Sequence, residues 1–273
     1  MKENDKCDES LSEFFRHLQL AREQLNNNHQ AIRKARAFII EQLKKLSFSI
    51  EKSIRPLILG LQRIFKELPP RTKEALILLG KHGWYFDLQM PLPSLWDLKD
   101  LLANGNIEEV ENILIKHFED QIDIIEKSII DKFPERKKII TAAFNAHRRQ
   151  EYELSIPVLF AQTDGICKEV VDQYLFMKIR GRRIPQTAFY VEQIAANKIM
   201  MAFLSPLAQT LPVNAAENER DEGFDELNRH MVLHGQSLDY GNKKNSLKAI
   251  SLINYVSHVL DKKHSLNKGE VSF

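Results

Sequence analysis

Cysteine is almost absent from this chain. Cys7 and Cys167 are the only two among 273 residues, and they lie far apart outside any CxxC pair. A disulfide framework or a cysteine-rich zinc site needs several closely spaced cysteines, so the sequence argues against both. This cysteine usage predicts a protein of the reducing cytoplasm.

Glycine and proline are also scarce, at ten residues each, which disfavours a turn-rich all-β architecture.

Long apolar runs are missing too. The longest, Ile194–Leu207, is interrupted by Asn197, Lys198 and Pro206, whereas a membrane-spanning helix needs about 20 apolar residues. The first residues, Met1–Leu11, are charged and lack the apolar segment of a signal peptide. We therefore expect no membrane partner and no secretory signal.

Neither sign of charge is in large excess. The 39 lysines and arginines nearly balance the 37 aspartates and glutamates, giving a formal net charge of +2 and a pI of about 8.4. This balance does not mark a nucleic-acid binder, so any RNA site has to come from local clustering of cations. HExxH, Walker A and GxGxxG patterns are absent from the sequence. We predict neither a metal nor a nucleotide cofactor.

Helical periodicity runs through nearly the whole chain. Apolar residues recur at spacings of three and four, as expected for helices that each bury one face. The sequence therefore predicts an all-α fold. The expected helices lie at 11–25, 32–68 with a break near Pro56, 71–80, 95–102, 107–129, 135–149, 152–176, 188–207, from about 224 to the motif below, and 245–260.

Polar and proline signals mark several helix ends. Ser94 is a predicted N-cap, Asn104-Gly105 a C-terminal stop, and Phe133-Pro134 the end of the 107–129 helix. We expect a division near residue 134. An N-terminal helical region at 1–133, with a regulatory or assembly role, precedes a helical bundle at 134–264 and a tail at 265–273.

The most informative segment is Asn228–Gln236, which reads Asn-Arg-His-Met-Val-Leu-His-Gly-Gln. Arg229 is a permanent cation whose planar donors suit phosphate oxygens. His234 is of the residue type that exchanges protons near neutral pH. Such a pair can cleave RNA without a metal, because the ribose 2'-hydroxyl supplies the nucleophile. We predict Arg229 as the charge clamp and His234 as the proton-transfer group.

The pattern Arg229-His230-x-x-x-His234-Gly235 resembles the RxxxxH signature of HEPN-type endoribonucleases, in which a polar residue often follows the arginine and a glycine often follows the histidine. The setting is similar as well, because the motif lies late in the chain and precedes a final amphipathic helix at 245–260. The resemblance covers about the last half of the chain.

This resemblance implies a HEPN-like bundle at 134–264. It implies that Asn228 and His230 support the catalytic pair, and that Asp164 or Gln162 orients Arg229. It also implies that two copies of the motif meet across a homodimer in one composite cleft. Proteins of this kind often act as toxins or in abortive defence against phage. The resemblance therefore makes an antitoxin or a regulatory protein a candidate partner.

Helix geometry bears on the composite cleft. Positions five apart on an ideal helix are about 140° apart in rotation and ~7.5 Å apart along the axis. Arg229 and His234 therefore do not share a face, whereas His230 and His234, four apart, do. A second chain would complete the site, and two copies of His234 could then serve as base and acid.

Structural interpretations of the same residues stay open. Arg229 can instead pair with Asp225 or Glu226, and His234 can interact with the dipole at a helix C-terminus. His230 can be a solvated helix position. A further interpretation places Glu226, His230 and His234 on one helix face as a metal site of a small-molecule enzyme.

Other candidate residues lie outside the motif. Tyr240 can stack on an RNA base or pack the loop, and Asp164 and Gln162 can be ordinary surface or capping residues. A basic loop can bind the RNA backbone or be merely solvated; it comprises Lys178, Arg180, Arg182 and Arg183. The leading hypothesis is a metal-independent endoribonuclease with RNA as its partner. The alternative is a non-catalytic helical dimerisation or nucleic-acid-binding module.

Overall fold

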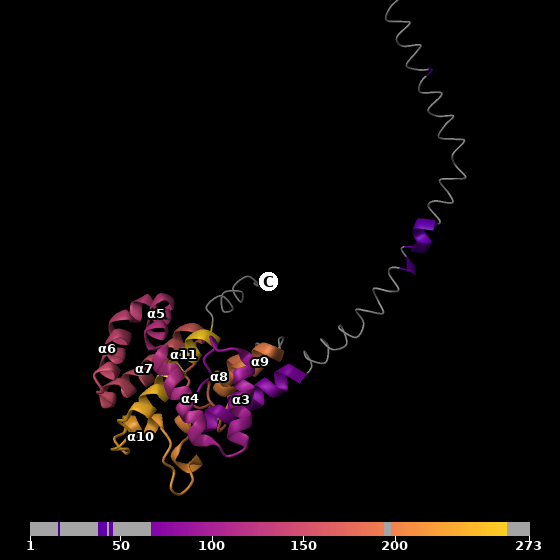
Figure 1. Cartoon of the computed structure of the whole chain (residues 1–273). Helices are drawn as coiled ribbons and strands as arrows, with labels where there is room; N and C mark the ends of the chain where they lie inside the picture. The colour runs from indigo at the N-terminus through magenta and orange to yellow at the C-terminus, as the bar shows by residue number, and fades with distance from the viewer. Residues whose placement is uncertain (1–15, 17–37, 43, 46–66, 194–197, 261–273) are drawn as a thin grey trace, which may run out of the picture. The chain divides into compact units, whose positions relative to one another are not determined.

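A computed structural model describes residues 16, 38–42, 44–45, 67–193 and 198–260 (Figure 1). The density of contacts divides the chain into two units, Met1–Phe65 and Lys66–Phe273. The helices predicted at 11–25 and 32–68 lie largely outside the described residues, as does the predicted tail at 265–273. Residues 38–42 and 44–45 are helical.

The described part of the second unit is built from helices. Its one pairing of extended residues is an isolated antiparallel bridge between Lys178 and Pro185, so the predicted all-α class is confirmed. After a helix at 67–81 come α3 (Leu92–Ala103), α4 (Ile107–Asp120), α5 (Ile122–Lys132), η1 (Pro134–Arg136), α6 (Lys137–Arg148), α7 (Tyr152–Val171), α8 (Thr187–Gln193), α9 (Lys198–Leu204), η2 (Ser205–Ala208), η3 (Pro212–Asn214), η4 (Glu217–Glu219), α10 (Arg229–Leu233) and α11 (Lys243–Val259).

The last helix, α11, is the centre of the fold. It packs along α7 and also contacts α4 and α5, while α7 packs against α6 as the second arm of the predicted hairpin (Figure 1). The sequence predicted an amphipathic helix here, but the polar residues Lys248, Ser251, Asn254 and Ser257 are buried together with the apolar ones. Each has at least one hydrogen-bonding partner, which lowers the cost of burial, although the side-chain oxygen of Asn254 has none among the described residues. For example, the Ser251 and Ser257 hydroxyls donate to carbonyls one turn earlier, at 2.7 and 2.8 Å.

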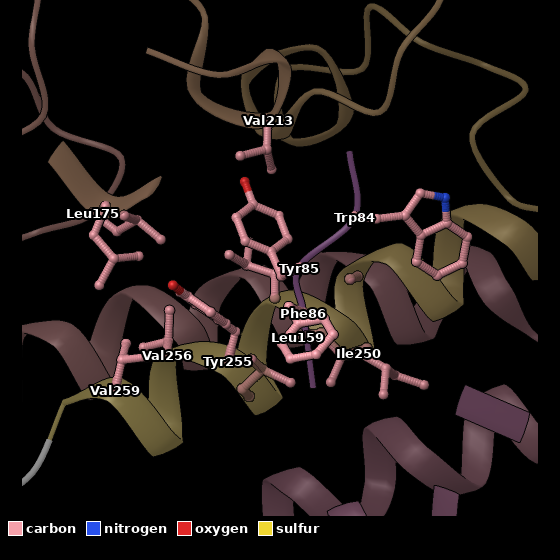
Figure 2. Close-up of a cluster of buried hydrophobic side chains, with 14 of the residues drawn as sticks. Trp84, Tyr85, Phe86, Leu159, Leu175, Val213, Ile250, Tyr255, Val256 and Val259 are labelled. Atoms are coloured by element: carbon pink, nitrogen blue, oxygen red, sulfur yellow. The ribbon is translucent and has the colours of Figure 1, made fainter. Parts of the chain in front are cut away.

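The connector between the helix at 67–81 and α3 runs through the core. Trp84, Tyr85 and Phe86 are at most 4% exposed. Figure 2 shows Tyr85 and Phe86 close to Leu159 of α7 and Tyr255 of α11. Burying side chains of this size stabilises the fold by roughly 1.5–3 kcal/mol each. The connector thus holds α7 and α11 together.

A buried carboxylate fixes the end of this connector. Asp87 is 1% exposed, and its oxygens lie 2.8 Å from His117 Nε2 of α4 and 3.1 Å from Asn254 Nδ2 of α11. Burial acts to raise the pKa of Asp87. Hydrogen bonds from His117, the Gln89 N–H and Asn254 outweigh burial and hold this pKa below its usual value.

The boundary expected near residue 134 falls inside one core. Leu114 of α4 and Ile129 of α5 belong to the same buried cluster as Phe144 of α6 and Ile253 of α11. The reason is the path of the chain. Because α11 comes last and lies against helices from both sides of residue 134, the two sides form one packing unit.

Sequence signals located some helix ends and missed others. Asn104 and Phe133 end α3 and α5 as predicted, and Gly105 adopts a φ of +82° that favours glycine. The prediction of Ser94 as an N-cap is wrong, because α3 begins at Leu92, two residues earlier. The prediction of one helix over 107–129 is also wrong, because α4 and α5 are separated at Gln121. Both helices continue the same apolar stripe, so periodicity does not reveal the break.

Candidate active site around α10

The predicted motif helix is much shorter than expected. Instead of starting near Phe224, α10 comprises only Arg229–Leu233, and Asn228 is its N-cap in an extended conformation. The Asn228 side chain accepts a hydrogen bond from the Met231 N–H at 3.0 Å. A polar side chain that caps the backbone in this way competes with helix continuation, so the helix begins after it.

Asn228 also ties α10 to an earlier segment. Its amide nitrogen donates to the carbonyls of Pro212 and Ala215, at 2.6 and 3.0 Å, and the residue is 1% exposed. With its oxygen and nitrogen both engaged, Asn228 is a positioning residue. It fixes the start of α10 against the segment that carries η3 and η4.

The carboxylate expected to neutralise Arg229 is occupied elsewhere. Glu226 lies before α10 and accepts from Lys248 Nζ of α11 at 2.9 Å, and Asp225 is exposed. Arg229 forms no ion pair with any residue that the structure describes. The alternative in which Arg229 pairs with Asp225 or Glu226 is therefore wrong. Glu226 also cannot share a helix face with His230 and His234, because it precedes the helix.

Arg229 is directed toward the segment after α7. Its guanidinium carbon lies 5.6 Å from the centroid of the Phe176 ring, a cation–π distance. The Asp164 carboxylate accepts from the Leu175 and Phe176 N–H groups at 2.7 and 3.1 Å. Burial raises the pKa of Asp164, while these two bonds and the charge of Arg229 act to lower it. Asp164 thus supports Arg229 through Phe176 and by charge.

Gln162 does not take part in this arrangement. Its side-chain oxygen accepts from Arg136 of η1 at 2.9 Å. Of the two residues expected to orient Arg229, Asp164 is the one on which the charge of Arg229 acts, and its orienting role stays a prediction. The two positions are only two apart on α7 and so point in different directions on the helix.

The two histidines of the motif are in contact. The ring centroids of His230 and His234 are 4.2 Å apart with an interplanar angle of 43°. His234 is the C-cap of α10, and Gly235 follows it with a φ of +67°. The predicted stop at Gly235 is confirmed, and it leaves His234 exposed at the helix end. Arg229 packs on Phe176, and its charge also acts on His230.

His230 lies in a positive field. Its pKa is lowered by partial burial and by the charges of His234, Arg220 and Arg229, while Glu217 opposes them. Neutral imidazole is thereby favoured. Sequence reasoning missed Arg220, because a single arginine within the acidic run Glu217–Glu222 has no pattern that connects it to the motif.

The basic loop is a tight turn closed by the Lys178–Pro185 bridge, with the Ile179 N–H donating to the Ile184 carbonyl at 3.0 Å. Arg180, Arg182 and Arg183 are exposed on it. Lys178 forms an ion pair with Glu219 and so anchors η4 to this loop. A role of Lys178 in RNA binding stays a prediction.

Tyr240 packs the loop after the motif. Its hydroxyl donates to the Glu153 carbonyl at 3.0 Å, and its ring packs against the hydrophobic core. This agrees with the loop-packing interpretation, and base stacking by the partly exposed ring stays a prediction. The physical reason is that the loop from Gln236 to Asn242 closes onto the start of α7, which gives the ring a protein surface to cover.

Comparisons of the chain with protein-family models, with curated proteins and with solved structures find no match in any of the three. Within the described residues there is no group of three or more His, Cys, Asp or Glu side chains placed to hold a metal ion. None of the helices in that part of the chain is long and apolar enough to cross a membrane.

Proposed function

We propose that this chain is a metal-independent endoribonuclease whose active site is formed by α10. The observation that carries the proposal is the contact between the His230 and His234 rings at the exposed end of the helix. Proton transfer in RNA cleavage needs groups that exchange protons near neutral pH, and imidazoles do so. Arg229, without an ion pair among the described residues, supplies a cation beside them.

The proposed reaction is transesterification. A base removes the proton of the ribose 2'-hydroxyl, and the 2'-oxygen attacks the adjacent phosphorus. The bond from phosphorus to the 5'-oxygen breaks, and an acid protonates that oxygen. The products are a 2',3'-cyclic phosphate and a 5'-hydroxyl. His234 transfers the protons, and a guanidinium stabilises the charge that develops on the phosphoryl oxygens.

We further propose a homodimer as the active species. Arg229 packs on Phe176, and His234 is at the other end of α10, so we expect a second copy to be needed to bring both groups to one phosphate. Two copies meeting at their exposed α10 ends bring the partner's His234 close enough for one histidine to act as base and the other as acid. By the family resemblance, the role in the cell is that of a toxin or of abortive defence against phage.

The central experiment is cleavage of single-stranded RNA in the presence of EDTA. Wild type is expected to cleave and to leave 2',3'-cyclic ends, while Arg229→Ala and His234→Ala lose activity by a factor of about 10² or more. Arg149→Ala is the matched control, because Arg149 is exposed and, among the described residues, pairs with Glu151 two residues away. RNA binding without cleavage in wild type would instead support the non-catalytic module.

A second experiment tests the dimer. Sedimentation at micromolar concentration is expected to show a dimer, and activity per chain should fall on dilution below its dissociation constant. A monomer that retains full activity per chain would refute the composite site while leaving the assignment of Arg229 and His234 intact.

A further inference from the structure

Arg220 belongs to a segment that is tied to α10 by a defined set of contacts. It directly follows η4, whose Glu219 accepts from the Ala216 N–H at 2.8 Å and pairs with Lys178. Ala215, the residue before Ala216, accepts a hydrogen bond from Asn228 at the start of α10 through its carbonyl. The segment is thus fixed at both ends, once to the basic loop and once to the motif.

The charge of Arg220 has no partner within the described residues. Its Nε is buried without a hydrogen-bond acceptor, and its guanidinium forms no ion pair with any described residue. A buried donor without an acceptor is unfavourable. Guanidinium donors have the geometry that binds two phosphate oxygens at once. The donors of Arg220 therefore suit an oxyanion.

Arg220 also acts on the histidine pair. The charge of Arg220 lowers the pKa of His230 more than the charge of Arg229 does. The groups facing His230 are His234 and Arg229 from α10 and Arg220 and Glu217 from the η4 segment. Three of these four repel a proton on His230, so the local field favours an anion.

We propose that Arg220, His230 and His234 form a binding subsite for a phosphate group, which in RNA is a phosphodiester at or next to the cleaved bond. The identity of the ligand as RNA rests on the proposed function, whereas the binding of a phosphate group does not. Arg220 donates to the phosphate oxygens from the same chain that provides the histidines. Arg229, packed on Phe176, is the second cation of the composite cleft.

Titration of the full-length protein with inorganic phosphate tests the subsite without any cleavage assay. The ring-proton NMR signals of His230 and His234 are expected to shift as phosphate binds. Arg220→Gln should weaken the apparent affinity about tenfold or more, because a charge-assisted donor is lost, and Arg220→Lys should weaken it less. Removal of the cation should also raise the pKa of His230 in the free protein. Arg149→Gln is the control and should match wild type.

Two results would overturn the subsite: phosphate leaves both histidine signals unchanged, or Arg220→Gln binds phosphate as wild type does while its circular dichroism is native. A kinetic arm separates this proposal from the endoribonuclease. If RNA is cleaved but Arg220→Gln keeps the wild-type kcat/KM and pH profile, the subsite fails and the enzyme stands. If no RNA is cleaved but phosphate binding depends on Arg220, the enzyme fails and the subsite stands.

Discussion

Removing the Asn228 side chain should destabilise the protein far more than removing an ordinary helix cap. Asn228→Ala abolishes the cap on the Met231 N–H, worth about 1 kcal/mol. It also takes the donor away from the carbonyls of Pro212 and Ala215, at roughly 1 kcal/mol each when the group is left without a partner. The total is about 3 kcal/mol, or roughly a hundredfold in the unfolding equilibrium.

Urea unfolding of the full chain, followed by the fluorescence of buried Trp84, measures this change. Asn242→Ala is the matched control. Asn242 caps α11 by accepting from the Asn245 N–H at 2.9 Å but is exposed, so its loss should amount to only about 1 kcal/mol. Asn228→Asp keeps the acceptor for Met231 but replaces the donating amide. The free energy of unfolding of Asn228→Asp should be well below that of wild type, because a carboxylate then faces the two carbonyls.

The reasoning fails if Asn228→Ala and Asn242→Ala lose equal stability, since the two bonds to the η3–η4 segment would then contribute nothing. Amide hydrogen exchange adds a local test. Protection should fall at Met231–Leu233 and at Asn214 in Asn228→Ala, because α10 loses its tether. Unchanged protection at both places would contradict the assignment of Asn228 as the residue that joins them.

Two other perturbations probe the framework around the site. Burial lowers the pKa of His147 from 6.5 to about 4, so the unfolded state binds the proton between these pH values and stability falls as pH drops from 6.5 to 4, by about 3 kcal/mol. The urea midpoint of unfolding, measured as a function of pH, should fall less steeply between pH 6.5 and 4 in His147→Gln than in wild type. Equal pH dependence in the two proteins would contradict this assignment to His147. Lys248→Met removes the ion-pair partner that lies 2.9 Å from the carboxylate of Glu226. The substitution should destabilise the protein by about 2 kcal/mol after allowance for the partial exposure of Glu226. The double variant with Glu226→Gln should regain part of this loss, and a double variant no more stable than Lys248→Met would show that the pair is not coupled.

Local signals in the sequence were sufficient for much of the fold. Apolar periodicity identified the α6–α7 hairpin and α11, and Asn104-Gly105 identified a helix end, because these features depend on neighbours within one or two turns. The polar face of α11 was misjudged for the same reason. Whether Lys248 and Asn254 meet water or the side chains of Glu226 and Asp87 depends on segments more than 20 residues away.

The candidate site divides in the same way. The motif residues Asn228, Arg229, His230 and His234 could be selected from residue type and spacing, and helix geometry alone predicted that Arg229 and His234 would point apart. Arg220 could not be found, because its relation to His230 exists only after Glu219 binds Lys178 and Asn228 binds Ala215. Those bonds join segments distant in sequence, and no local pattern records them.

The sequence by itself determined the helical class, the presence of the motif and the residue types available for its chemistry, since these follow from composition and short-range spacing. Only the tertiary structure decided that α10 is a five-residue helix, that Glu226 pairs with Lys248, and that the charge of a second arginine, Arg220, acts on His230. These outcomes depend on which side chains pair when the whole chain packs. That pairing is determined by contacts between segments distant in sequence and not by neighbouring residues.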